Sequence, residues 1–114
     1  MKLIHNFKSP NFNERRSEEV KFIIIHYTAI KGELNSIKYL CSKKNKVSSH
    51  FLISKKGEIY SLVSEKKRAW HAGQSYWKGQ KDINSISIGI ELDYVPDIKN
   101  KKQYSGNLIK SLLF

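Results

Sequence analysis

A short apolar run, residues 20–28, limits the folds that this chain can adopt. Its sequence, Val-Lys-Phe-Ile-Ile-Ile-His-Tyr-Thr, is β-branched and aromatic and ends beside an ionisable ring. Such a run is typical of a strand buried on both faces of a sheet, and we expect residues 20–27 to be its central strand. Because side chains alternate along a strand, Phe22, Ile24 and His26 should share one face. His26 is then either a hydrogen-bonded core histidine or a site residue at a strand end, and its spacing favours neither.

Other segments carry the periodicity of one helix and three more strands. Leu34, Ile37, Leu40 and Cys41 predict a short helix over residues 35–42. The predicted strands are residues 47–53, 59–63 and 86–92, of which the first two should form a hairpin with Gly57 at positive φ in its turn. The pattern predicts an α/β fold, with a mixed twisted β-sheet flanked by helices.

The two ends of the chain differ from this middle part. Residues 1–19 have no clear period and are expected to form an N-terminal arm without regular structure, with residues 20–114 as the domain. Near the C-terminus, Tyr104, Leu108, Ile109, Leu112 and Leu113 recur at helical spacing up to Phe114. That helix has no capping residue after it, which suggests a chain that is incomplete at its C-terminus.

Charge and size restrict the classes of partner. The 114 residues suffice for one domain, and 21 basic against 10 acidic side chains give a net charge of +11. The lysines are scattered and no nucleic-acid-binding motif accompanies them, so we expect no nucleic-acid partner. A charge-driven binder of nucleic acid or acidic polymers stays open as a rival that predicts steeply salt-dependent binding.

The cellular context is predicted from two absences in the sequence. A single cysteine, Cys41, cannot form an internal disulfide and fits a reducing compartment. The first 20 residues hold no long apolar stretch, so neither a signal peptide nor a membrane span is expected there. We therefore predict a cytoplasmic monomer that does not associate with membranes.

Glu91 is the most informative acidic residue. In the strand predicted over residues 86–92, the isoleucines face one way while Ser87, Gly89 and Glu91 face the other. A carboxylate between buried isoleucines is costly unless it has a partner or a chemical role. We expect Gly89, on the same face, to leave open space beside it for substrate or water.

A loop and a second histidine complete the candidate residues. Residues 68–79 place three aromatic residues, His71 and two glycines in one segment, which is typical of a ligand-binding wall. Trp70 and Trp77 would alternatively anchor that loop to the sheet, and both interpretations can hold. His50, in the middle of a predicted strand, is interpreted as structural or pocket-lining.

Six segments in order resemble the type-2 N-acetylmuramoyl-L-alanine amidases of the AmpD/AmiD kind, which are related to peptidoglycan recognition proteins. They are residues 9–16, 24–28, 47–53, 57–60, 69–75 and 84–92. The resemblance implies hydrolysis of the amide between N-acetylmuramic acid and L-alanine in peptidoglycan or muropeptides. It also implies a Zn²⁺ cofactor, with His26 as the first zinc ligand, Glu91 as the catalytic acid–base residue, and Trp70 and His71 on the substrate side.

The same resemblance exposes what this chain lacks. The family's second zinc histidine and its aspartate follow the glutamate strand, but no histidine or cysteine follows Glu91 here, and Asp93 and Asp97 come too early. A catalytic zinc normally has three protein ligands. A zinc site formed by His26, His50 and His71 would also supply three protein ligands, and this arrangement is the less favoured one. A non-catalytic muropeptide-binding module is the alternative function.

Overall fold

The computed structural model describes residues 2–17, 19–73 and 82–96, and these contain ten short elements. The predicted helix at residues 104–113, residue Trp77 and much of the aromatic loop lie outside the described residues. The elements are β1 (Leu3–Ile4), β2 (Phe12–Glu14), β3 (Phe22–Tyr27), α1 (Glu33–Leu40), the 3-10 helix η1 (Lys43–Asn45), β4 (Phe51–Ile53), β5 (Ile59–Ser61), β6 (Lys67–Ala69), the 3-10 helix η2 (Ile83–Ile86) and β7 (Ser87–Leu92).

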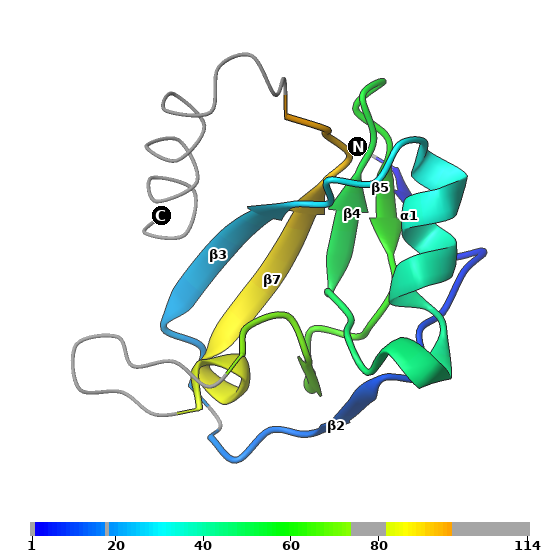
Figure 1. Ribbon diagram of the computed structural model, residues 1–114. Coiled ribbons are helices and arrows are strands. Elements are labelled where there is room, and N and C mark those ends of the chain that lie inside the picture. Colours follow the sequence, from blue (N-terminus) through cyan, green and yellow to red (C-terminus); the bar gives the residue numbers. More distant parts are fainter. Residues whose placement is uncertain (1, 18, 74–81, 97–114) are drawn as a thin grey trace.

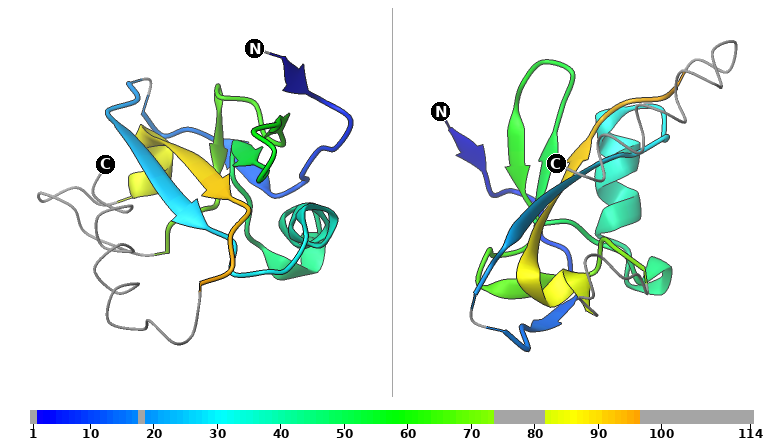
Figure 2. Two further views of the ribbon diagram at one scale, coloured as in Figure 1. Left: turned by 90° about the horizontal axis from the view of Figure 1, so that it is seen from above. Right: turned by 90° about the vertical axis from the view of Figure 1, so that its left-hand side faces the viewer.

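Five of the strands form one mixed sheet in the order β1-β5-β4-β7-β3. The pairs β1–β5, β4–β7 and β3–β7 are parallel, whereas β4 and β5 are antiparallel. Strands β2 and β6 pair separately in an antiparallel ribbon, and Figures 1 and 2 show this arrangement. The predicted mixed α/β sheet and its β4–β5 hairpin are confirmed.

The core lies between α1 and one face of the sheet. Ile37 and Leu40 on the helix pack with Leu52, Tyr60 and Leu62 from the β4–β5 region, and Leu52 is fully buried. Figure 1 shows α1 beside β4 and β5. The helix begins at Glu33, two residues earlier than predicted, and the Tyr60 hydroxyl donates a 2.9 Å hydrogen bond to the Glu33 carboxylate. Apolar packing and this hydrogen bond therefore both join α1 to the β4–β5 hairpin.

The prediction that residues 1–19 lack regular structure is wrong. Leu3–Ile4 pairs with β5 and extends the main sheet, and Phe12–Glu14 pairs with β6. The same pairing places Arg68 and Ala69, which were predicted to begin a loop, in the strand Lys67–Ala69. These strands have two or three residues, so alternation cannot reveal them, and their partners lie about 55 residues away in the sequence.

The position of β3 in the sheet also differs from the prediction. Within the described residues β3 is an edge strand that pairs only with β7, and Ile23 is 42% exposed. β-Branched residues indicate a strand, but an apolar run alone does not establish how many neighbours the strand has. The interior positions belong instead to β5, β4 and β7, with β4 in the middle.

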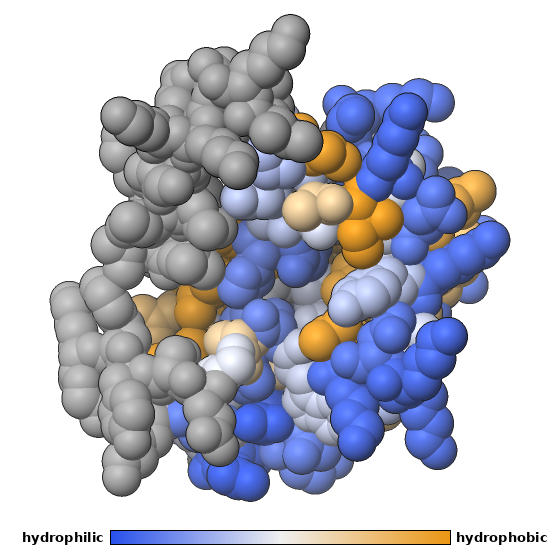
Figure 3. Space-filling view, viewed as in Figure 1, coloured by the Kyte–Doolittle hydropathy of each residue, from blue (hydrophilic) through white to orange (hydrophobic). Residues whose placement is uncertain are grey.

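The surface is mixed in character on the face seen in Figure 3. Apolar side chains gather near the middle of that face, and hydrophilic ones dominate its right-hand edge. None of the helices in the described residues is long and apolar enough to cross a bilayer.

Gly57 offers a test of the hairpin turn. It has φ +83°, and a Cβ at this position would meet no atom within 4 Å. We expect Gly57→Ala to lower the free energy of unfolding by about 1 kcal/mol through backbone strain alone. Urea unfolding measures this change. Lys56→Ala in the same exposed turn is the control and should change stability far less.

Candidate active site

His26 and Glu91 are direct neighbours on the two parallel strands β3 and β7. Their Cα atoms are register partners, and Leu52 of β4 is the partner of Glu91 on the other side. Residues in register on neighbouring strands point to the same face, which here is the face covered by α1. The register therefore brings this imidazole and this carboxyl to one face of two neighbouring strands.

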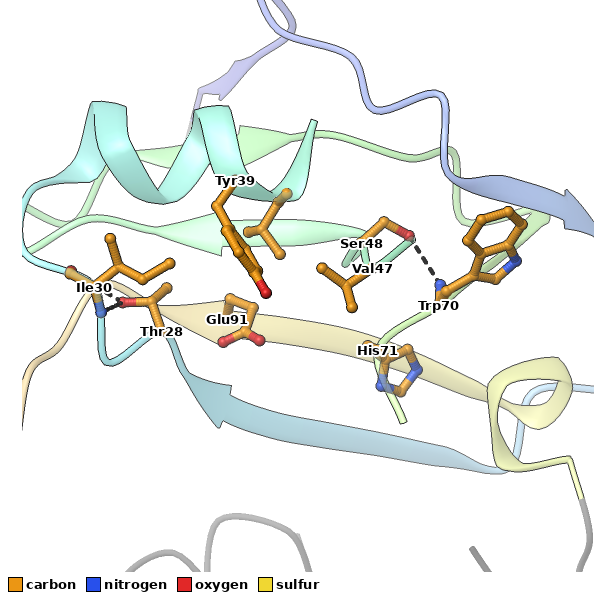
Figure 4. A pocket seen from close by; sticks show the side chains of 9 residues that line it. Thr28, Ile30, Tyr39, Val47, Ser48, Trp70, His71 and Glu91 are labelled. Atoms are coloured by element: carbon orange, nitrogen blue, oxygen red, sulfur yellow. Dashed lines mark hydrogen bonds between the residues drawn. The ribbon is translucent and has the colours of Figure 1, made fainter. Parts of the chain in front are cut away.

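A cavity of about 140 Å³ lies above this part of the sheet. Its lining consists of Thr28, Ile30, Tyr39, Leu40, Val47, Ser48, Trp70, His71 and Glu91. Figure 4 shows the Tyr39 side chain extending toward Glu91 of β7, His71 nearer the start of the same strand, and Trp70 at the end opposite Thr28. Because pockets for drug-sized ligands occupy about 300–1,000 Å³, this cavity has room for only part of a larger ligand.

Glu91 is the chemically exceptional group in this cavity. Its Oε2 atom is buried and has no hydrogen-bond partner among the described residues. Burial raises the pKa of the Glu91 carboxyl to about 7, because the charged form loses solvation. Near neutral pH this carboxyl is divided between its ionised and protonated forms, so it can both accept and donate a proton.

His71 fills the space that Gly89 was predicted to leave open. A Cβ on Gly89 would lie 2.3 Å from Cγ of His71, so the ring rests directly on the glycine backbone. The predicted vacancy beside Glu91 at this position is therefore wrong, because a residue 18 positions earlier occupies it. Both ring nitrogens of His71 have partners: Nδ1 lies 3.0 Å from His26 Nε2, and Nε2 lies 2.9 Å from the Ser87 hydroxyl.

The two contacting imidazoles are uncharged at neutral pH. Burial is the largest cause that lowers the pKa of His71, to about 2, and the nearby His26 and His50 act in the same direction. Burial also lowers the pKa of His26. The two rings meet edge to face, with centroids 5.2 Å apart.

Both ring nitrogens of His50 bond to the backbone, and the Arg15 Nη2 atom also lies 3.1 Å from His50 Nε2. The Gly89 N–H donates to His50 Nδ1 at 3.0 Å, and Nε2 lies 2.8 Å from the Lys67 carbonyl, to which it donates. Burial, together with the Arg15 charge, lowers the pKa of His50 to about 4. With both nitrogens used, His50 joins β4, β6 and β7 and has none left for a metal, which supports the structural interpretation.

Trp70 and the neighbouring loop backbone are anchored by residues that the sequence did not single out. The Trp70 indole donates to Asn13 at 3.0 Å. The side chain of Asn84 accepts from the His71 and Ala72 N–H groups and donates to the Ala72 carbonyl. Asn84 has no local signal for this role, whereas Ser87 was detectable because it shares a strand face with Glu91.

The described residues do not complete a zinc site. Within residues 2–17, 19–73 and 82–96, no group of three histidine, cysteine, aspartate or glutamate side chains is arranged to hold a metal ion. His26 Nε2 faces His71, and His50 is occupied by backbone groups. The less favoured three-histidine site is therefore not formed by these residues.

Comparison with known proteins places this chain in a family. The family model described as N-acetylmuramoyl-L-alanine amidase matches residues 16–112, which include His26, Trp70, His71 and Glu91. The chain belongs to the N-acetylmuramoyl-L-alanine amidase family. The resemblance drawn from the sequence motifs is thereby confirmed.

Curated relatives agree with this assignment. The amidase AmiD of Escherichia coli is 42% identical over 81 residues, which cover 65% of this chain and 28% of AmiD. The 1,6-anhydro-N-acetylmuramyl-L-alanine amidase AmpD of Haemophilus influenzae is 30% identical over 104 residues, which cover 75% of this chain and 56% of that protein. The chain thus spans about a quarter of AmiD and about half of this AmpD.

Solved structures of the family share the fold. A crystal structure of a selenomethionine AmpD derivative superposes with a TM-score of 0.70 at 28% identity, covering 80% of this chain and 61% of that one. Escherichia coli AmiD, solved in complex with the substrate anhydro-N-acetylmuramic acid-L-Ala-D-γ-Glu-L-Lys, gives a TM-score of 0.59 at 34% identity, covering 75% and 40%. The amidase-like α/β fold is thus confirmed.

Proposed function

We propose that this amidase-family chain acts on the amide between N-acetylmuramic acid and L-alanine in muropeptides or peptidoglycan. The observation that carries the proposal is the Glu91 carboxyl, which borders the cavity, has a pKa raised to about 7, and holds one buried oxygen without a partner among the described residues. Amide hydrolysis requires proton removal from the attacking water and proton delivery to the leaving amine, and a carboxyl with this pKa suits both steps.

The cavity supports binding of one part of such a ligand. Ile30, Val47 and Tyr39 supply apolar walls, and Thr28 and Ser48 supply hydroxyl groups at its edges. We propose that Trp70, which borders the same cavity, contacts the substrate. His71 also borders it, but its ring nitrogens are used within the protein, so any contact with substrate would involve its carbon edge.

Zinc is proposed as the cofactor, with His26 as one ligand. When bound, zinc would lower the pKa of a coordinated water and polarise the amide carbonyl. The described residues do not supply the other ligands, and residues 74–81 and 97–114 contain no histidine or cysteine. The chemistry that the chain's own residues support is proton transfer at Glu91.

A muropeptide-binding module without catalysis is the second candidate. The observation that favours it is the same lack of a three-ligand group among the described residues. The net charge of +11 would attract the carboxylates of a stem peptide in either case. Binding and turnover therefore have to be measured separately.

A single set of measurements distinguishes the candidates. The chain, with and without added Zn²⁺, is incubated with anhydro-N-acetylmuramic acid-L-Ala-D-γ-Glu-L-Lys, and release of the tripeptide is followed by mass spectrometry. Calorimetry measures binding of the same compound, and metal analysis gives the zinc content. Zinc-dependent release supports the amidase, and saturable binding without release supports the module. Neither binding nor release would contradict both.

A further inference from the structure

A line of hydrogen bonds runs from the backbone of η2 to the His26 ring. The Ser87 hydroxyl donates its proton to the Ile83 carbonyl at 2.7 Å. The same Ser87 oxygen lies 2.9 Å from His71 Nε2, and His71 Nδ1 lies 3.0 Å from His26 Nε2. Each contact is within ordinary hydrogen-bond distance, so the donor in each can be worked out in order.

The first donor determines all the others. A hydroxyl has one proton, and Ser87 gives its proton to Ile83, so Ser87 can only accept from His71 Nε2–H. A neutral imidazole with its proton on Nε2 has a lone pair on Nδ1. His71 Nδ1 must then accept from His26 Nε2–H, which leaves the His26 lone pair on Nδ1. No described residue bonds to His26 Nδ1, and it is not among the buried unpartnered atoms.

Two further features fix the position of the His71 ring, namely its contact with Gly89 and the hydrogen bonds of Asn84 to the neighbouring backbone. Gly89 lacks the Cβ that would collide with the ring, so this strand position admits the imidazole only when it is glycine. Asn84 bonds to the backbone N–H of His71 and to both backbone groups of Ala72. Removal of either feature would misplace the ring without changing any hydrogen-bonding group of Ser87 or His26.

We propose that Ser87 and His71 are positioning residues that hold His26 with its proton on Nε2 and its lone pair on Nδ1. That nitrogen is then the atom of His26 available to a metal ion or another electrophile. Histidine ligands commonly donate their second ring N–H to a neighbouring group, which fixes the tautomer. The use of Nδ1 rests on the proposed function, whereas the tautomer itself does not.

The test is nitrogen NMR of the metal-free protein with ¹⁵N-labelled histidine, at about pH 8 where unperturbed imidazoles are also neutral. Long-range ¹H–¹⁵N correlations distinguish a protonated ring nitrogen from one with a lone pair. We expect a single His26 form, protonated at Nε2. A wild-type His26 protonated at Nδ1 would overturn the proposal, even if no variant folds.

Two variants test the positioning residues themselves. In Ser87→Ala, His71 is free to adopt either tautomer. We therefore expect the ratio of Nε2-protonated to Nδ1-protonated His26 to fall about fivefold, the factor that one net hydrogen bond provides. Gly89→Ala should produce the same loss while the Ser87 hydroxyl stays intact. Ser36→Ala removes an equally buried hydroxyl on α1 and is the control, with no expected change at His26.

The outcomes separate this proposal from the proposed function. A folded Ser87→Ala protein in which His26 keeps its single wild-type form would overturn the positioning roles, whatever its activity. Because the spectra require neither substrate nor zinc, failure to hydrolyse muropeptide leaves their interpretation unchanged. Dispersed backbone amide spectra establish that each variant is folded.

Discussion

Replacing Glu91 with glutamine should lower the rate of muropeptide amide hydrolysis by about 10²–10⁴-fold, the usual contribution of a positioned general acid–base group. Glutamine has nearly the same shape and retains an oxygen acceptor, but it cannot take up or release the proton. We therefore expect fold and ligand affinity to change little. The measurement is tripeptide release under the conditions in which the wild-type chain shows turnover, together with calorimetric binding of the same muropeptide.

Glu58→Gln is the matched control for this experiment. Glu58 is an exposed acid beside the β4–β5 turn, so its substitution removes one negative charge without touching the cavity. The rate of muropeptide hydrolysis by Glu58→Gln should stay close to that of the wild type. Full activity in Glu91→Gln would refute the acid–base role. A parallel loss of binding would show instead that Glu91 holds the ligand.

The second large effect is the pH dependence of stability that Glu91 imposes. Its pKa is raised from 4.5 to about 7 in the folded protein, so the unfolded chain gives up this proton at lower pH than the folded chain. The free energy of unfolding should therefore fall as pH rises from about 4.5 to 7, by about 3 kcal/mol in total, and then level off. Glu91→Gln cannot ionise and should escape this loss.

The measurement is the difference in unfolding free energy between Glu91→Gln and the wild type, from urea titrations at several pH values between about 4 and 8. The difference should grow in favour of Glu91→Gln across this interval. Burial lowers the pKa values of His26, His50 and His71, so these histidines destabilise the fold as pH falls. The two proteins share these histidines, so the difference between their unfolding free energies isolates the effect of Glu91. A difference that stays constant with pH would contradict a raised Glu91 pKa.

The elements longest in sequence were predictable because their side-chain periods are local. Strands β3 and β7 carry six residues each, and alternation along them predicted which residues share a face with His26 and which share a face with Glu91. The β4–β5 hairpin was marked by its turn, in which Gly57 adopts the expected positive φ. Strands β1, β2 and β6 were missed because two or three residues carry no usable period.

The residues of the candidate site were predictable from the sequence, whereas the contacts between them were not. Local pattern and family resemblance together identified His26, Trp70, His71 and Glu91 as the residues to examine. They did not reveal that the His71 ring would occupy the space over Gly89 or that Ser87 would bond to it. Those contacts join a loop to a strand 16–18 residues further along the chain, and such distances in sequence have no periodic signature.

The amino-acid sequence by itself determined the strand character of β3 and β7 and membership of the amidase family, because each is encoded in local alternation or in ordered motifs. Only the tertiary structure decided that β3 lies at an edge of the described sheet, that Glu91 Oε2 is buried without a hydrogen-bond partner among the described residues, and that His71 contacts His26. The physical reason is that burial and hydrogen-bond partners depend on segments brought together by folding.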